Sequence, residues 1–282
     1  MIVVTGAAGI IGCELMARLK AEGIEAIGVR REAFDLSSDN SLVRFVGRRP
    51  EVIVHLAAAV PHSLHYPDSD SSAAITRVID KVLFAAATYW GCRLIYASTC
   101  SLYDKSTSEV KFEDTAVMPR ADSPYMRVKY EGERLFGTLP SYSILRVPAP
   151  IGPGLPDTVV AKRFLNQAMA GQTIRVWGTG RREQNYVDVS DIADIFLRAG
   201  FSSATGIFNI SADAPTTMLE LAETMVQVVN RGSFELTGAA DPLEVEYARY
   251  SNARAYEQLG LKPKKSLEES IRSMYEACNE NN

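Results

Sequence analysis

The stretch MIVVTGAAGIIG, residues 1–12, joins an apolar run to a loop that carries glycines at Gly6, Gly9 and Gly12. The apolar run predicts a buried strand, and the residues that follow predict a helix. In such a strand–turn–helix unit the first glycine permits the tight turn. The second lets the backbone approach a pyrophosphate, and the third allows close packing of the helix on the strand. Because the N-terminus of a helix attracts negative charge, the loop predicts a dinucleotide-binding site.

Short β-branched runs alternate with helix-length segments through the first half of the chain. Strands that are apolar along their whole length, separated by helices, indicate a parallel sheet covered on both faces. The predicted strands are MIVVTG (1–6), EAIGV (25–29), EVIVHLAAA (51–59), RLIYAST (93–99) and YSILRV (142–147).

The pattern changes after residue 147, where the Pro/Gly-rich PAPIGPGLP (148–156) predicts a loop that leaves the sheet. Further strands, TIRVWG, NYVDV and GIFNI, then alternate with helical segments. We therefore expect an α/β protein with a Rossmann-type, doubly wound parallel sheet and a smaller C-terminal α/β lobe. Residues 1–150 are predicted to form the dinucleotide-binding domain, which segments at about 174–210 rejoin, and most of 151–282 the substrate-binding lobe.

The composition excludes several classes of function. The net charge of −4 gives no basic footprint for nucleic acid, and no run approaches the ~18 apolar residues of a membrane span. Four scattered cysteines without a CxxC pair fit a reduced, cytoplasmic compartment better than a disulfide framework. His55, His62 and His65 have no carboxylate or cysteine partner at ligand spacing, so no metal site is predicted.

The end of the second predicted strand bears on the cofactor. An NAD-type site usually has an acidic residue there, about 20 residues beyond the glycines, to bind the ribose hydroxyls. This chain has Arg30 and Arg31 instead. A guanidinium can bind a 2′-phosphate with two hydrogen bonds, which favours NADP, with NAD as the alternative. The structural alternative is a solvated basic turn. Asp35 and Leu36 are then placed to touch the adenine edge.

Tyr125 and Lys129 lie four residues apart in SPYMRVKYEGE, so a helix puts them on one face. A surface helix with an incidental aromatic–basic pair is the structural alternative. A phenol titrates near 10, and bringing its pKa to about 7 needs roughly 4 kcal/mol, to which an adjacent ammonium contributes. A hydroxyl donor is expected at a neighbouring strand end, where Thr99 stands, with Ser98 and Ser101 as alternatives and loop capping as their structural explanation.

Taken together, these residues resemble the extended short-chain dehydrogenase/reductase family of nucleotide-sugar epimerases, dehydratases and ketoreductases. The resemblance covers nearly the whole chain, through TGAAGIIG, HLAAAV, YASTCSLYD, YMRVK, LRVPAPIGPG, WGTGRREQNYVDVSDIA and FNISADAPTTMLELA. It implies Thr99, Tyr125 and Lys129 as the catalytic set, with Tyr125 as proton shuttle and Lys129 also on the nicotinamide ribose. It implies that His55 flanks the cofactor. The full predicted cofactor set is Gly6, Ala8, Gly9, Ile10, Ile11, Gly12, Arg30, Arg31, Asp35, Leu36, Leu56, Ala57, Ala58, Tyr125, Lys129 and Val147.

Three departures from the family pattern narrow the expected reaction. The dehydratases have Asp-Glu after the active-site Thr, where this chain has Cys100 and Ser101; this disfavours a dehydratase and, through Ser101, a decarboxylase. Cys100 is expected to pack, with acid–base work as the alternative. The Asn that holds an active-site water is missing near residues 75–76. The Arg-Asp-Phe motif is replaced by 184–186, Gln-Asn-Tyr, so the predicted substrate-binding residues are Ser101, Arg182 and Gln184, with Arg181 as a further candidate for the missing Arg.

The sequence therefore predicts an NADPH-dependent 4-ketoreductase that acts on a sugar carbon of a nucleotide-sugar-like substrate. The alternative is an NAD-retaining nucleotide-sugar 4-epimerase. A non-catalytic dinucleotide-sensing module and an enzyme of apolar alcohols are further hypotheses; the intact Tyr125–Lys129 pair disfavours the first, and the polar, basic RREQNYVDV disfavours the second. The resemblance implies a homodimer through helices at about 80–90 and 125–136.

Overall fold

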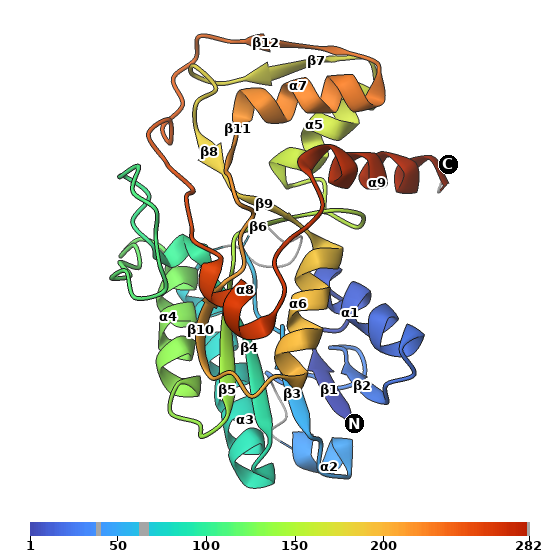
Figure 1. The fold of residues 1–282 in the computed structure, drawn as a ribbon, viewed down its shortest axis with the longest axis vertical. Coiled ribbons are helices and arrows are strands. Elements are labelled where there is room, and N and C mark those ends of the chain that lie inside the picture. The colour runs from blue at the N-terminus through green and yellow to red at the C-terminus, as the bar shows by residue number, and fades with distance from the viewer. Residues whose placement is uncertain (38–40, 62–67, 281–282) are drawn as a thin grey trace.

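The structure is a computed structural model, which describes residues 1–37, 41–61 and 68–280. Figure 1 shows two lobes stacked along the long axis: a larger one built on a central sheet, which holds the N-terminus, and a smaller upper one, which holds the C-terminus. We call them the sheet lobe and the upper lobe.

The sheet lobe contains a six-stranded sheet in the order β10-β5-β4-β3-β1-β2, in which every neighbouring pair is parallel. This confirms the predicted fold class. The third predicted strand is shorter than expected, because residues 56–59 leave the sheet before the edge cavities described below. The strands are β1 (Ile2–Thr5), β2 (Ala26–Val29), β3 (Val52–His55), β4 (Arg93–Thr99), β5 (Tyr142–Val147) and β10 (Gly206–Asn209).

Helices cover both faces of this sheet (Figure 1). Ile2 and Val4 share a core with Leu15 of one helix layer, whereas Val3 shares a core with Leu83 of the other. Because alternate side chains point to opposite, covered faces, the strands are apolar along their whole length. One face carries α1 (Ile10–Ala21), α6 (Val189–Phe201) and α8 (Ala253–Leu259); the other carries α2 (Leu42–Val46), α3 (Asp70–Trp90) and α4 (Pro124–Phe136).

The upper lobe has its own apolar core, to which Phe164, Leu221 and Ile271 contribute. Strand β10 follows α6 in the sheet lobe and pairs with β5, whereas β7 pairs with β12 in the upper lobe. The boundary between two domains at residue 150 stays a prediction. The remaining elements are the 3₁₀ turn η1 (Cys100–Leu102), β6 (Ala149–Ile151), α5 (Val160–Met169), β7 (Thr173–Val176), β8 (Glu183–Gln184), β9 (Tyr186–Asp188), β11 (Thr216–Thr217), α7 (Met218–Val229), β12 (Ser233–Leu236) and α9 (Leu267–Glu280).

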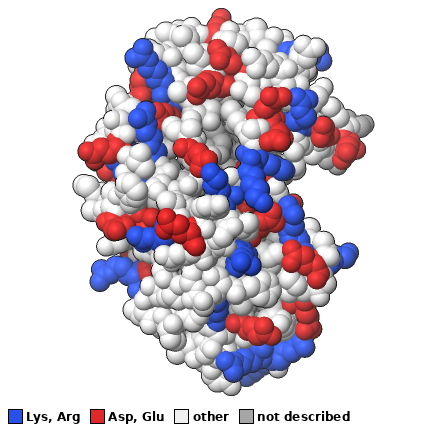
Figure 2. Space-filling model, in the orientation of Figure 1, with Lys and Arg blue, Asp and Glu red and all other residues white. Residues whose placement is uncertain are grey.

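The helices formed by the described residues include none that is both long and apolar enough to cross a membrane. On the face of the molecule in Figure 2, basic and acidic side chains are interspersed, with no single-sign patch.

Candidate active site

The glycine loop after β1 is packed too closely for side chains at two of its three glycines. Gly6 has a φ of +68°, and a Cβ there would lie 2.8 Å from the backbone nitrogen of Ala57. A Cβ on Gly12 would lie 2.8 Å from the Cα of Ala7 and closer still to the carbonyl oxygen of Gly6. Gly9, in contrast, would meet only the Gly6 oxygen, at 3.3 Å. Packing within the protein therefore requires glycine at the turn and in the helix, but not at Gly9.

Two cavities open at the carboxyl edge of the sheet, on either side of this loop, and both are lined by Gly6, Gly9 and Ala58. Cavity A, of about 310 Å³, reaches the ends of β4 and β5. Cavity B, of about 590 Å³, reaches the end of β2. Every residue of the full predicted cofactor set lines cavity A, cavity B or both. Cavity A is lined by Gly6, Gly9, Ile10, Ile11, Gly12, Leu56, Ala58, Tyr125, Lys129 and Val147; cavity B is lined by Gly6, Ala8, Gly9, Arg30, Arg31, Asp35, Leu36, Ala57 and Ala58.

The two arginines at cavity B differ in their surroundings. Arg31 Nε lies 3.5 Å from Asp35 Oδ2. Asp35 Oδ1 accepts hydrogen bonds from the Ser37 hydroxyl (2.6 Å) and backbone nitrogen (2.9 Å), and these, with Arg31, lower the pKa of Asp35. Arg30 is exposed and makes no ion pair within residues 1–37, 41–61 and 68–280. Of the two arginines, Arg30 is therefore the one whose positive charge has no carboxylate at ion-pair distance in the described part of the protein.

Thr99, Tyr125 and Lys129 all line cavity A. Thr99 ends β4, and its Oγ1 accepts a hydrogen bond from the Ser101 backbone nitrogen (3.1 Å), as the N-cap of η1. The hydroxyl proton of Thr99 can therefore point to a ligand. Tyr125, half-buried in the first turn of α4, is anchored by its backbone nitrogen, which donates to Asp68 Oδ1 (2.8 Å).

Lys129 is buried one helical turn further along α4. Its Nζ donates to the carbonyl oxygen of Ala97 (2.8 Å) and lies 4.6 Å from the centre of the Tyr96 ring. Burial lowers the pKa of Lys129, while the carboxylates of Asp80 and Glu133 act in the opposite direction.

The phenol of Tyr125 corrects one expectation. Its pKa is raised, because burial and then the carboxylates of Asp68 and Asp80 disfavour the phenolate. The adjacent ammonium was expected to lower it. Lys129 instead directs its Nζ to Ala97, so the protein's own groups keep the phenol protonated.

The three predicted substrate residues are not brought to one cavity. Ser101 lines a third cavity, of about 650 Å³, between the loop after β4 and residues 242–246. Arg182 donates from Nη1 to Asp241 Oδ1 (3.3 Å), and Gln184 pairs with Thr216 in the β8–β11 ladder. Neither lines cavity A, cavity B or the Ser101 cavity.

Some residues that line cavity A were not predicted from the sequence, and Cys100 beside them has a packing role. Cavity A is also lined by Ala97, Ser98, Pro148 and other unpredicted residues, which directly precede or follow predicted ones at strand ends. Cys100 is buried, donates to the Arg146 carbonyl oxygen (3.2 Å) and has a raised pKa because of burial, which fits packing.

Where the family has an Asn, Thr76 accepts a hydrogen bond from the Ala59 nitrogen (3.0 Å). His55 itself lines neither cavity A nor cavity B, whereas the next residues, Leu56 and Ala57, do; its place beside the cofactor stays a prediction. His62 and His65 lie outside the described residues.

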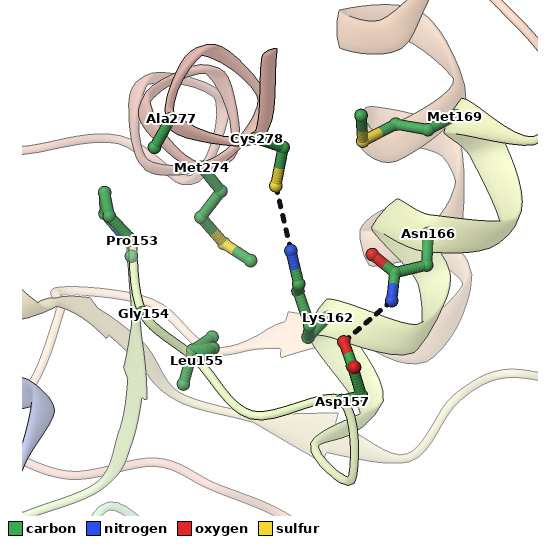
Figure 3. Close-up of a pocket in the computed structure, with 11 residues that line it drawn as sticks. Pro153, Gly154, Leu155, Asp157, Lys162, Asn166, Met169, Met274, Ala277 and Cys278 are labelled. Carbon is green, nitrogen blue, oxygen red and sulfur yellow. Dashed lines mark hydrogen bonds between the residues drawn. The ribbon is translucent and has the colours of Figure 1, made fainter. Parts of the chain in front are cut away.

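A further cavity, of about 490 Å³, lies between the loop after β6, α5 and α9 (Figure 3). Lys162 Nζ of α5 donates to Cys278 Sγ of α9 (2.8 Å), and Asn166 of α5 donates to Asp157 in the loop before that helix (2.8 Å). None of Thr99, Tyr125 and Lys129 lines this cavity, so it is separate from cavity A.

Comparison with known proteins gives the family. The model of the NAD dependent epimerase/dehydratase family matches residues 2–211. The chain belongs to this family. This confirms the resemblance to the extended short-chain dehydrogenases/reductases.

Among its relatives in this family is the UDP-glucose 4-epimerase of Mycolicibacterium smegmatis, 29% identical, with 95% of each chain covered. A solved UDP-glucose 4-epimerase of Thermotoga maritima with UDP-glucose has the same fold (TM-score 0.86, 23% identity, 99% of each chain). So does RMD from Pseudomonas aeruginosa complexed with NADPH (TM-score 0.84, 21% identity, 100% of this chain and 99% of that one).

Proposed function

We propose that the protein is an NAD(P)(H)-dependent enzyme that reduces or oxidises a sugar carbon of a nucleotide-sugar-like substrate, with Tyr125 as the proton shuttle. The observation that carries this is one cavity lined by the glycine loop and by Thr99, Tyr125 and Lys129 together. The relatives named above, an epimerase and proteins of the same fold with UDP-glucose or NADPH, support the substrate and cofactor classes.

The residues present fit a nicotinamide dinucleotide. Gly9, where a Cβ would meet only the Gly6 oxygen at 3.3 Å, lines both cavities at the N-terminus of α1, where a pyrophosphate would be favoured. Cavity B would hold the adenosine half, beside Arg30, and cavity A the nicotinamide half. The nicotinamide, when bound, supplies or takes a hydride.

The catalytic residues move and hold a proton. In the reducing direction, the protonated phenol of Tyr125 donates its proton to the oxygen of the substrate carbonyl. The hydroxyl of Thr99 donates a hydrogen bond to the same oxygen, and Lys129 stabilises the phenolate that forms. Leu56 and Val147 line the cavity with apolar side chains, which exclude water from the reacting atoms.

Two observations favour an NADPH-dependent 4-ketoreductase. The raised pKa of Tyr125 suits a proton donor, and Arg30 at cavity B suits a 2′-phosphate. The second candidate, an NAD-retaining 4-epimerase, is favoured by the Mycolicibacterium relative. Substrate binding by Ser101, Arg182 and Gln184, a cytoplasmic location and a homodimer through α3 and α4 are parts of the same proposal.

The test is to purify the protein without added nucleotide and to identify any bound cofactor after denaturation. The protein is then assayed at 340 nm with NADPH or NADH and 4-keto nucleotide sugars, and by product analysis with UDP-glucose. A reductase releases its cofactor and consumes NADPH; an epimerase retains NAD and inverts the sugar. Tyr125→Phe is the matched control. Failure to bind either nucleotide, or equal turnover by the Tyr125→Phe variant, would refute the proposal.

A further inference from the structure

A chain of buried polar side chains approaches Lys129 from the interior of the sheet lobe. His55 Nδ1 lies 2.9 Å from Thr5 Oγ1, and His55 Nε2 lies 3.0 Å from Asp80 Oδ1. The hydroxyl of Tyr96 donates to the other oxygen of Asp80 (3.3 Å). These four side chains are at most 2% exposed and line neither cavity A nor cavity B. The chain ends under Lys129, whose Nζ lies 4.6 Å from the Tyr96 ring centre.

Helix α4 leaves room for two of these side chains at a buried glycine. This glycine is Gly132, three residues after Lys129. A Cβ on Gly132 would lie 2.8 Å from Asp80 Oδ2 and closer still to the Tyr96 hydroxyl. Glycine inside a helix costs about 1 kcal/mol relative to alanine. The close approach of Asp80 and Tyr96 to α4 is therefore a reason for glycine at this position.

The hydrogen bonds assign the protons. The Ala57 backbone nitrogen donates to Thr5 Oγ1 (3.3 Å), so the Thr5 hydroxyl is free to donate to His55 Nδ1. His55 Nε2 then carries the proton that it donates to Asp80. Burial lowers the pKa of His55 and raises that of Tyr96, so both are neutral at pH 7. Among these four hydrogen-bonded side chains, Asp80 is then the only one that carries a negative charge.

Glu133 is the other carboxylate that acts on Lys129, but its charge is already balanced. Arg146 donates to it from Nε (2.9 Å) and Nη2 (2.7 Å), and both side chains are buried. Asp80, in contrast, has no Arg or Lys within ion-pair distance anywhere in the described chain. Of the two carboxylates that raise the pKa of Lys129, Asp80 is therefore the one whose charge no Arg or Lys balances in the described chain.

We propose that Asp80 is a positioning residue, whose buried carboxylate keeps Lys129 protonated beside Tyr125 in the water-excluding site. This inference rests on the proposed function, in which a positively charged Lys129 stabilises the phenolate of Tyr125. A buried ammonium without a counter-charge would lose its proton. The titratable groups that face Lys129 are Tyr125 and Glu133 from α4, Asp80 from α3, His55 from β3 and Tyr96 from β4.

The direct test measures the protonation of Lys129 and needs no turnover. In protein labelled with [ε-¹³C]lysine, the Lys129 signal is assigned by its loss in Lys129→Met and followed by NMR against pH. In wild type it is expected to be protonated at pH 7. Asp80→Asn keeps the size and the acceptor for Tyr96 but removes the charge, and should shift the equilibrium toward the neutral amine by about tenfold or more.

Asp68→Asn is the matched control. Asp68 is a carboxylate that raises the pKa of Tyr125 but is not among the groups that act on Lys129. It should leave the Lys129 titration unchanged. A neutral Lys129 in wild type at pH 7, or the same titration in wild type and Asp80→Asn, would overturn the proposal; the wild-type measurement can refute it even where the variant does not fold.

Kinetics give a second readout. Asp80 favours the protonated forms of both Lys129 and Tyr125, so its removal should move the alkaline limb of the pH–rate profile to lower pH. A merely structural role would lower the rate without moving that limb. Absence of turnover in wild type would count against the proposed function and leave the NMR test intact, whereas normal turnover with an unmoved limb would count against Asp80 alone.

Discussion

We predict that the preference between the two nicotinamide dinucleotides depends on Arg30. This side chain is exposed, lines cavity B and makes no ion pair in the described part of the chain, whereas Arg31 lies 3.5 Å from Asp35. A charge-assisted hydrogen bond contributes about 1.5–3 kcal/mol, and exposure places Arg30 at the lower end. About 1.5 kcal/mol corresponds to a roughly tenfold tighter binding of NADPH than of NADH. Arg30→Asp should reverse the preference, because it removes an attraction and adds a repulsion.

The assay is a fluorescence titration of wild type and variant with NADPH and NADH at one fixed salt concentration, since exposed charges are screened. Arg31→Gln is the matched control. Because Arg31 shares its charge with Asp35, its loss should change the affinity for NADPH by less than about threefold. Equal affinities of wild type for both nucleotides, or a larger effect at Arg31 than at Arg30, would refute this reasoning and favour the 4-epimerase.

Four other predictions concern the catalytic pair and the glycine loop. Tyr125→Phe should reduce turnover by about a hundredfold or more and leave cofactor affinity within a few-fold, because only the proton-transferring oxygen is lost; a loss of less than about tenfold would remove Tyr125 from the mechanism. Lys129→Met should weaken both the rate and cofactor binding, and an unchanged dissociation constant would leave Lys129 only its contact with Ala97. Because the pKa of Tyr125 is raised, the reduction rate should be flat through neutral pH and fall only at alkaline pH; a decline already between pH 6 and 8 would contradict the protonated phenol. Gly12→Ala should destabilise folding by about 1–3 kcal/mol, seen as a lower Tm, whereas Gly9→Ala should leave Tm near wild type and weaken cofactor binding; equal Tm losses would refute the distinction.

The sequence alone determined the strands of the central sheet and the residues that stand at their carboxyl ends. Apolar runs covered on both faces can be recognised without a structure, because burial on both sides removes polar residues from a strand. Strands β4 and β5 were predicted with their observed bounds. Since parallel strands end at one edge, residues at their carboxyl ends, such as Thr99 and Val147, had to meet there.

Only the tertiary structure decided the electrostatics of the site and the surroundings of the substrate residues. The spacing of Tyr125 and Lys129 suggested that the ammonium lowers the phenol pKa, yet the carboxylates that raise it, Asp68 and Asp80, come from a different part of the chain. Arg182 and its partner Asp241 are likewise far apart in the sequence. Coulomb interactions and desolvation depend on distances through space, and a sequence fixes those only within one helix or strand. Local pattern therefore located the glycine loop and the residues proposed to be catalytic, while the charges that act on them follow from the packing of α3 and α4 against the sheet.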